Sequence, residues 1–380
     1  MPKKRMPSFR IGRLGVPELT SLLIIYSVSD VFLSYPSRIV TEGATSGWMI
    51  PLLAGVIVLV VWLVIDRILK KTKTTNVIES LATWVPFPLI SVVLLILSIF
   101  ILLQTSLILR EFTEAVIATV LPNTPPPIVA LTFLLVVIYF STKGVEVISR
   151  AALMFMYSFI AGMVLLLVLP LSWFHTVQLL PIWGNGIKNI AAYGMINTST
   201  FYQILILLFL SPALRKESLR TKVGIYSIIV SAVLVSAFVI VLLGTFTMPV
   251  TEKMTYPIYQ LSRIIYVSRF IQRLEAIFVF IWTSAAVIKM GLGLWFTAYL
   301  FAYAQKIPVY RPLIFIFALI LYMLTFLPPD LPTVLSLAGS IYETYGGLIT
   351  ILLPVLLVLF VHFRRPSAKL RHEQEEGRRG

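Results

Sequence analysis

The sequence predicts an all-α polytopic membrane protein of about ten transmembrane helices. Hydrophobic residues fill 58% of the 380 positions and charged residues only 12%, whereas an ordinary soluble domain carries about 25% charged residues. The apolar runs are continuous and about 20 residues long, which is the length that a helix needs to cross a bilayer. A membrane barrel would show short segments of alternating hydrophobicity instead. Helices in lipid are therefore the structure that this composition favours.

Ten apolar runs give the expected spans. A basic stretch precedes the first run, but no small-residue cleavage site follows it, so we expect an uncleaved first span. The fourth run is short, and the eighth is long enough to be tilted or broken. The chain then divides into a basic N-terminus over 1–16, a transmembrane domain over 17–363 and a basic tail over 364–380. The approximate bounds of the runs are 17–38, 48–66, 86–109, 126–141, 150–173, 189–210, 222–246, 273–303, 311–327 and 336–361.

The formal net charge of +15 follows from where the basic residues lie. In a soluble protein such a charge would indicate nucleic acid. Here 23 of the 31 Lys and Arg residues fall in one alternate set of connections and only six in the other. The positive-inside rule places the basic set, with both termini, in the cytoplasm. We therefore expect the lipid bilayer as a partner of these residues, and no nucleic acid. The basic set is the N-terminus, 67–85, 142–150, 211–222, 304–311 and the tail.

Five spans in each half would make the second half enter the membrane with the opposite orientation, as in the inverted repeats of many secondary transporters. The first span of each half is interrupted by polar or helix-breaking residues. The first run carries Ser27 to Asp30 and then Tyr35-Pro36, and the sixth carries Gly194 and the polar run 197–200. Interrupted helices at corresponding positions predict a binding site at the membrane midplane.

Two charged residues, Asp30 and Lys289, lie deep inside apolar runs, where a charge costs at least about 2.5–3.5 kcal/mol. Asp30 could contact a ligand or a cation, or could instead be a structural partner or lie at the outer water interface. Lys289 could replace a coupling cation, pair with Asp30 or hold a ligand carboxylate; the alternative is snorkelling or a static ion pair.

Uncharged polar residues extend the candidate site. Asn197 and Thr198 lie at the Gly-containing break, where free backbone groups can bind a small zwitterion. Their alternative role is interhelical hydrogen bonding. Gln104 in the third span could face a central cavity.

Two further features lie at the outer end of the spans. Glu111 at the end of the third span is expected to be solvated or paired with a nearby Arg. The segment 256–265 could lie flat at the outer surface.

The residues favour no enzyme class. The chain has no cysteine, and its three histidines are scattered. No P-loop, GxSxG or zinc motif is present, and no nucleophile stands beside a base. We expect no catalytic residues, no metal site and no cofactor.

A set of motifs in the second half resembles the signature of the B subunits of spore germinant receptors. That family pattern reads Tyr-Pro, Leu-x-Arg-x-Ile, Phe-Ile-x-Arg-x-Glu, an apolar helix with Trp, and a Lys. The third-span end around Arg110 and the first loop with Gly47-Trp48 also match, so the resemblance covers roughly 10–365. The matching residues of the second half are Tyr256, Pro257, Leu261, Arg263, Ile265, Phe270, Ile271, Arg273, Glu275, Trp282 and Lys289.

The resemblance implies the five-plus-five inverted repeat of the amino acid–polyamine–organocation superfamily. It also implies sensing of a small nutrient, often an amino acid, in the inner membrane of a bacterial spore. The implied partners are a larger A-type membrane subunit and a C-type lipoprotein. Ligand is expected where spans one and six unwind, with side chains from spans three and eight. Carried over by position, this indicates Ser29, Asp30, Val31, Gly194, Asn197, Thr198 and Thr283.

The first span departs from the family pattern. Members usually have Gly-x-Gly there, and this chain has Ser29-Asp30-Val31. Replacing both glycines and adding a carboxylate suggests a ligand with an extra positive charge, or a subunit that binds poorly. The functions left open are a germinant-sensing subunit, an amino-acid permease of the same fold and, more weakly, a ligand-gated channel.

Overall fold

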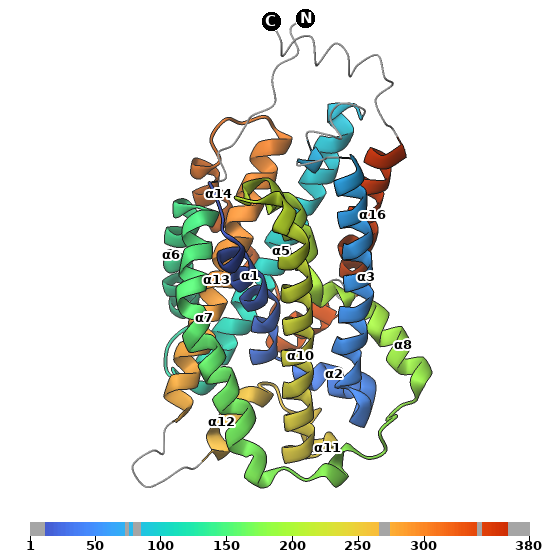
Figure 1. The fold of residues 1–380 in the computed structure, drawn as a ribbon. Coiled ribbons are helices and arrows are strands. Elements are labelled where there is room, and N and C mark those ends of the chain that lie inside the picture. The colour runs from blue at the N-terminus through green and yellow to red at the C-terminus, as the bar shows by residue number, and fades with distance from the viewer. Residues whose placement is uncertain (1–11, 73–75, 79–84, 266–273, 340–343, 364–380) are drawn as a thin grey trace, which may run out of the picture.

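The computed structural model shows a bundle of long helices standing side by side (Figure 1). It describes residues 12–72, 76–78, 85–265, 274–339 and 344–363. Within these ranges the only β-type pairing is an isolated bridge between Leu14 and Leu214. Most of the two predicted basic ends lies outside the described residues, as does the motif segment 266–273 of the outer connection.

The helices follow the ten predicted runs in order. The first half contains α1 (Val16–Val28), the 3-10 helix η1 (Ser29–Phe32), α2 (Tyr35–Gly43), α3 (Met49–Thr72), α5 (Phe87–Thr119), α6 (Pro126–Lys143) and α7 (Val145–Val168). The second contains α8 (Ile187–Ile196), the 3-10 helix η5 (Asn197–Phe201), α9 (Gln203–Leu210), α10 (Arg220–Phe246), α11 (Met248–Thr251), α12 (Pro257–Ile264), α13 (Leu274–Ala304), α14 (Arg311–Thr325), α15 (Leu331–Leu337) and α16 (Thr344–Phe363).

In the described ranges, seven helices are long and apolar enough to cross a membrane. The first predicted run makes an eighth candidate. Its two helical segments, Val16–Phe32 and Tyr35–Ser46, are together long and apolar enough to span, although they are bent by 71° relative to each other. Two shorter apolar helices, Arg311–Thr325 and Tyr345–Leu356, correspond to the ninth and tenth runs. Each of the ten runs contains helix in its described residues, and the all-α prediction is confirmed.

Both halves open with an interrupted helix, as predicted. In the first half the interruption is η1 and the bend behind it, and in the second it is η5, which joins α8 to α9. A 3-10 segment inside a helix often marks a hinge or a functional position.

The third span is longer than the sequence predicted. Its expected end was residue 109, whereas α5 continues to Thr119. The charged residues that seemed to end the span are accommodated in the helix. Arg110 pairs with Glu114 one turn further on, and Glu111 is buried at 7% exposure. An i,i+4 ion pair stabilises a helix rather than ending it.

Close packing sets the arrangement of the bundle. The long helices α5 and α13 pack along each other, and α3 packs along α10. The approach of α3 and α10 requires Gly224, because a Cβ at that position would overlap the Trp62 indole. Helix α1 contacts α7, α10 and α13, and its residues 21–28 are all buried. An all-round apolar helix is expected to lie inside the bundle in this way.

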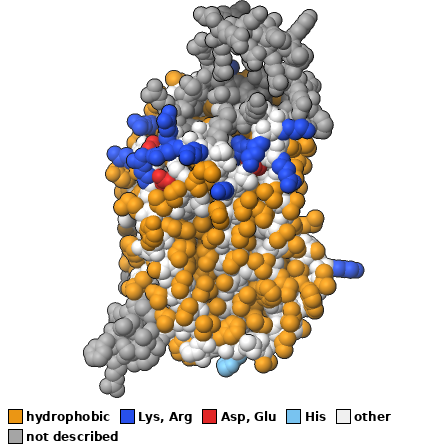
Figure 2. All heavy atoms as spheres, viewed as in Figure 1, with side chains coloured by type: hydrophobic (Ala, Val, Ile, Leu, Met, Phe, Trp, Pro, Cys, Tyr) orange, Lys and Arg blue, Asp and Glu red, His pale blue; other side chains and the backbone are white. Residues whose placement is uncertain are grey.

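The surface shows a broad apolar band with Lys and Arg side chains gathered at one end (Figure 2). Large side chains such as Leu135, Tyr157 and Leu319 are 58–78% exposed on this surface, which suits a protein whose solvent is lipid. The basic end is the one where α16 ends (Figure 1). We call this end the basic end and the opposite one the outer end, after the orientation that the positive-inside rule predicts from the sequence.

Candidate functional site

The break in the first span forms from local competition for backbone hydrogen bonds. The Ser29 hydroxyl donates to the Ile25 carbonyl, and Leu33 is extended, with φ −99° and ψ −151°. Serine hydroxyls offer the backbone an alternative to regular helix bonds. Pro36, at the start of α2, has no N–H with which to continue the preceding helix. The chain therefore turns between α1 and α2 and exposes the segment 29–34 to its neighbours.

Lys289 of α13 reaches this break from one side. Its Nζ lies 2.5 Å from Asp30 Oδ1 and 4.9 Å from the centroid of the Tyr26 ring. The Lys289 side chain is only 3% exposed, while that of Asp30 keeps 25% exposure. The two charges that the sequence placed inside apolar runs thus form an ion pair, which was one of the alternatives left open for each.

Glu111 of α5 reaches the same break from another side. Its Oε1 accepts a 2.8 Å hydrogen bond from the Ser34 backbone N–H and a 2.5 Å bond from the Ser34 hydroxyl. Glu111 was expected to be solvated or paired with a nearby Arg. Solvation was wrong, because Glu111 is buried, but the charge of Arg38 does act on its carboxyl group. Two side chains from two long helices, Lys289 and Glu111, thereby hold the two ends of the segment 30–34.

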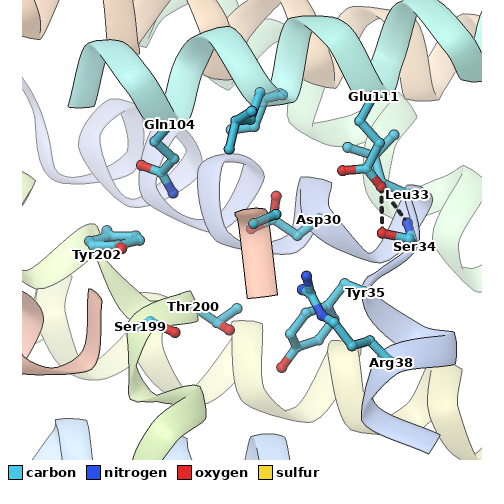
Figure 3. Close-up of a pocket in the computed structure, with 13 residues that line it drawn as sticks. Asp30, Leu33, Ser34, Tyr35, Arg38, Gln104, Glu111, Ser199, Thr200 and Tyr202 are labelled. Carbon is cyan, nitrogen blue, oxygen red and sulfur yellow. Dashed lines mark hydrogen bonds between the residues drawn. The ribbon is translucent and has the colours of Figure 1, made fainter. Parts of the chain in front are cut away.

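A small cavity lies against this segment (Figure 3). Its volume is about 80 Å³, well below the roughly 300–1,000 Å³ of sites for drug-sized ligands. Asp30 lies in the middle of the view, with Gln104 on one side and the Arg38 guanidinium directed toward it from the other. The residues that line the cavity are Asp30, Leu33, Ser34, Tyr35, Arg38, Gln104, Leu107, Ile108, Glu111, Ser199, Thr200, Tyr202 and Ala338.

Two of the nine predicted site residues, Asp30 and Gln104, line the cavity. Lys289 is connected to it through its ion pair with Asp30. Ser29 and Val31 are buried in η1 on either side of Asp30, without lining the cavity. Thr283 is partly exposed on α13 and is also not among the lining residues.

The predicted residues of the sixth span make structural contacts instead. Asn197 Nδ2 donates to Glu42 Oε2 and to the Tyr193 carbonyl, both at 2.9 Å. Thr198 donates to the Met195 carbonyl at 2.7 Å, and Gly194 packs against Leu53. The lining residues from this break are the next two along the chain, Ser199 and Thr200.

Glu111 and Arg38 are the charged lining residues that sequence reasoning missed. A signal for Glu111 was present in α5. Gln104, Leu107, Ile108 and Glu111 recur at helical spacing and all line the cavity, so they form one stripe of the helix. Glu111 lies two turns from Gln104 on that stripe. Nothing in the sequence distinguished Arg38 from an ordinary residue of an outer connection.

The cavity combines carboxylate, guanidinium, amide and hydroxyl groups in a small volume. Carboxylates bind an ammonium group, and a guanidinium binds a carboxylate through paired hydrogen bonds. Among the described residues no group of three or more His, Asp or Glu side chains could hold a metal ion. The arrangement suits a small zwitterion.

Glu111→Gln should lower the free energy of unfolding by about 1 kcal/mol, because the oxygen that accepts two hydrogen bonds from Ser34 is replaced by an amide, and a buried hydrogen bond contributes about that much. Ser34→Ala should have a similar effect, and the double variant should show coupling between the two sites. Thermal unfolding of the purified protein in detergent measures all three. Glu275→Gln is a matched control, since Glu275 forms no ion pair among the described residues. Additive effects of Glu111→Gln and Ser34→Ala would contradict the proposed bond.

Comparison with known proteins agrees with this fold. The sequence profile of a family described as spore germination protein matches residues 13–334. Spore germination protein KB of Bacillus subtilis (strain 168) is 22% identical over 295 residues, which cover 75% of this chain and 77% of that protein.

Two solved transporter structures share the architecture. A Na+-coupled sialic acid symporter, in its substrate-bound outward-open state, has a TM-score of 0.60 at 13% identity, covering 93% of this chain and 91% of that one. Mhp1, a nucleobase–cation-symport-1 family transporter in a closed conformation with bromovinylhydantoin bound, has a TM-score of 0.57 at 13% identity, covering 96% of each chain. These likenesses establish the transporter fold that the sequence resemblance implied. With the family profile matching most of its length, the chain belongs to the spore germination protein family.

Proposed function

We propose that this protein is the nutrient-binding membrane subunit of a spore germinant receptor, with an amino acid as its ligand. The observation that carries the proposal is the cavity at the break of the first span, where Asp30, Glu111 and Arg38 meet. Membership of the germination family and the transporter fold support a role in handling a small molecule. The expected partners are an A-type membrane subunit and a C-type lipoprotein, in the inner membrane of the spore.

The ligand ammonium would bind Asp30. A quarter of the Asp30 side chain is exposed although it pairs with Lys289, so this carboxylate retains room for a second partner. The carboxylate of the ligand would face Arg38 and the hydroxyls of Ser199 and Thr200 on the other lining segments. A cavity of about 80 Å³ favours a small amino acid over a large one.

Binding at Asp30 would alter how the first span is held. Asp30 is tied to α13 through Lys289, and Ser34 is tied to α5 through Glu111. A ligand shifts a conformational equilibrium only by its differential affinity for the two states. A ligand ammonium that competes with Lys289 for Asp30 supplies such a difference, because it weakens the link between the first span and α13.

An amino-acid permease is the second candidate function, and the fold of the two symporters favours it. In such a permease Lys289 would provide a fixed positive charge beside the substrate site. Uptake of labelled amino acids into vesicles that contain this protein alone distinguishes the two functions. Concentrative uptake would support the permease, and binding without uptake would support the receptor subunit.

The test of the binding site uses the full-length protein in lipid nanodiscs, titrated with each of the twenty amino acids. Asp30→Asn and Asp30→Gly should each weaken binding of the responding amino acid by about tenfold or more, since each removes the carboxylate that would bind the ligand ammonium. Asp330→Asn is the matched control, because Asp330 caps α15 at a fully exposed position. Unchanged affinity in the cavity variants would exclude this cavity as the ligand site.

A further inference from the structure

A second hollow, of about 810 Å³, opens at the outer end of the bundle. It lies between the end of α5, the segment 253–263 that includes α12, and the starts of α13 and α15. Its volume falls within the roughly 300–1,000 Å³ that is typical of small-molecule sites. Its lining residues are Glu114, Ala118, Thr119, Lys253, Met254, Thr255, Tyr256, Tyr259, Gln260, Arg263, Glu275 and Leu331.

The wall formed by α12 is fixed in place. The Tyr259 hydroxyl donates to the Thr119 carbonyl at 3.2 Å, which ties α12 to the end of α5. The Tyr259 ring also lies 6.2 Å from the Phe278 ring of α13, and α12 packs against α13. The hollow is therefore bounded by packed helices on several sides.

The charges around the hollow are of both signs. Lys253 and Arg263 are exposed, and neither forms an ion pair with another described residue. The Arg263 guanidinium carbon lies 5.9 Å from the centroid of the Tyr259 ring. Glu275 also has no ion pair within the described ranges, whereas Glu114 is bound by Arg110 at 2.9 Å. Two cations and one carboxylate thus remain available to a bound molecule.

Tyr256 brings a buried hydroxyl to the wall of the hollow. It lines the hollow and is only 7% exposed, and its hydroxyl finds no hydrogen-bond partner among the described residues. Burial, followed by the charges of Glu111 and Glu114, raises the pKa of Tyr256. The raised pKa keeps this hydroxyl a hydrogen-bond donor. A buried hydroxyl without a partner is costly, and a bound acceptor group would satisfy it.

We propose that the outer hollow is a second binding site for an amino acid, distinct from the central cavity. Lys253 and Arg263 bind the ligand carboxylate, Glu275 binds its ammonium, and the Tyr256 hydroxyl donates to a carboxylate oxygen. The choice of an amino acid as the ligand rests on the proposed function, whereas the hollow and its charged residues do not.

The experiment measures amino-acid binding to the full-length protein in nanodiscs when the cavity is impaired by Asp30→Asn. Each of the twenty amino acids serves as a probe by isothermal titration. The Asp30→Asn protein should retain one site, and Lys253→Gln with Arg263→Gln should weaken that site by about tenfold or more. Tyr256→Phe should weaken it less. Lys188→Gln is the control for loss of one positive charge, since Lys188 is exposed on α8 outside the hollow.

The outcomes separate the two sites. A single site in the wild type that Asp30→Asn abolishes and the hollow variants leave unchanged would overturn this inference and leave the cavity proposal intact. A single site that only the hollow variants abolish would support the inference and overturn the cavity proposal. No binding of any amino acid to the wild type would overturn both. Because Lys253 and Arg263 are exposed, their substitution should leave the unfolding temperature unchanged, so that lost binding is not lost folding.

Discussion

Replacing Lys289 with methionine is expected to lower the free energy of unfolding by about 3 kcal/mol. The substitution leaves the Asp30 carboxylate inside the membrane domain without its partner, and removing one member of a buried ion pair costs about 3–5 kcal/mol. The lower figure applies because the Asp30 side chain keeps 25% exposure, whereas Lys289 is 3% exposed. The contact between the Lys289 ammonium and the Tyr26 ring is lost as well.

The double variant Asp30→Asn/Lys289→Met should recover most of this loss, because it removes both charges together. Thermal unfolding in detergent compares the two single variants, the double variant and the wild type. Lys188→Met, at an exposed position of α8, should change the unfolding temperature little. If the double variant were as unstable as the sum of the single ones, the two residues would not be coupled and the ion pair would not hold the break.

The fold could be predicted from the sequence because membrane helices are specified by composition. Each run of apolar residues became a helix, and the interruptions near Ser29 and Asn197 became 3-10 segments in η1 and η5. The bounds were less predictable where charges interrupt an apolar run. Asp66 seemed to end the second span, yet α3 continues to Thr72 because Asp66 has partners on α10.

The candidate site could be predicted only in part, since its composition depends on which helix faces meet. Asp30 and Lys289 were identifiable because a charge in an apolar run needs a partner, and each proved to be the partner of the other. Asn197 was an equally suitable candidate for a ligand contact, but its amide nitrogen donates to Glu42 of α2. That partner is 155 residues away in the sequence, and no local pattern indicates it. Arg38 was overlooked for the same reason.

Replacing Asp66 with leucine is expected to have the largest effect on stability, a loss of about 4 kcal/mol. Asp66 Oδ1 lies 3.0 Å from Arg220 Nε, and the two side chains are only 3% and 4% exposed. The Asp66 carboxylate also accepts a hydrogen bond from the Thr221 hydroxyl at 2.5 Å. Its loss would leave the Arg220 guanidinium buried and without its carboxylate. The effect should exceed that of Lys289→Met because both members of this pair are shielded from water.

Lys70 provides the matched comparison within the same cluster. Its ammonium lies 2.8 Å from Asp66 Oδ2, but its side chain is 51% exposed, and exposed ion pairs contribute only about 0–1 kcal/mol. Lys70→Met should therefore cost much less than Asp66→Leu, and Asp66→Leu/Arg220→Met should regain most of the stability by replacing the pair with apolar side chains. Equal losses for Lys70→Met and Asp66→Leu would contradict this account. The pair joins α3 to α10 near the basic end, so its loss should separate these two helices there. In the protein that remains folded, the Asp30–Lys289 contact and amino-acid binding at the cavity should persist.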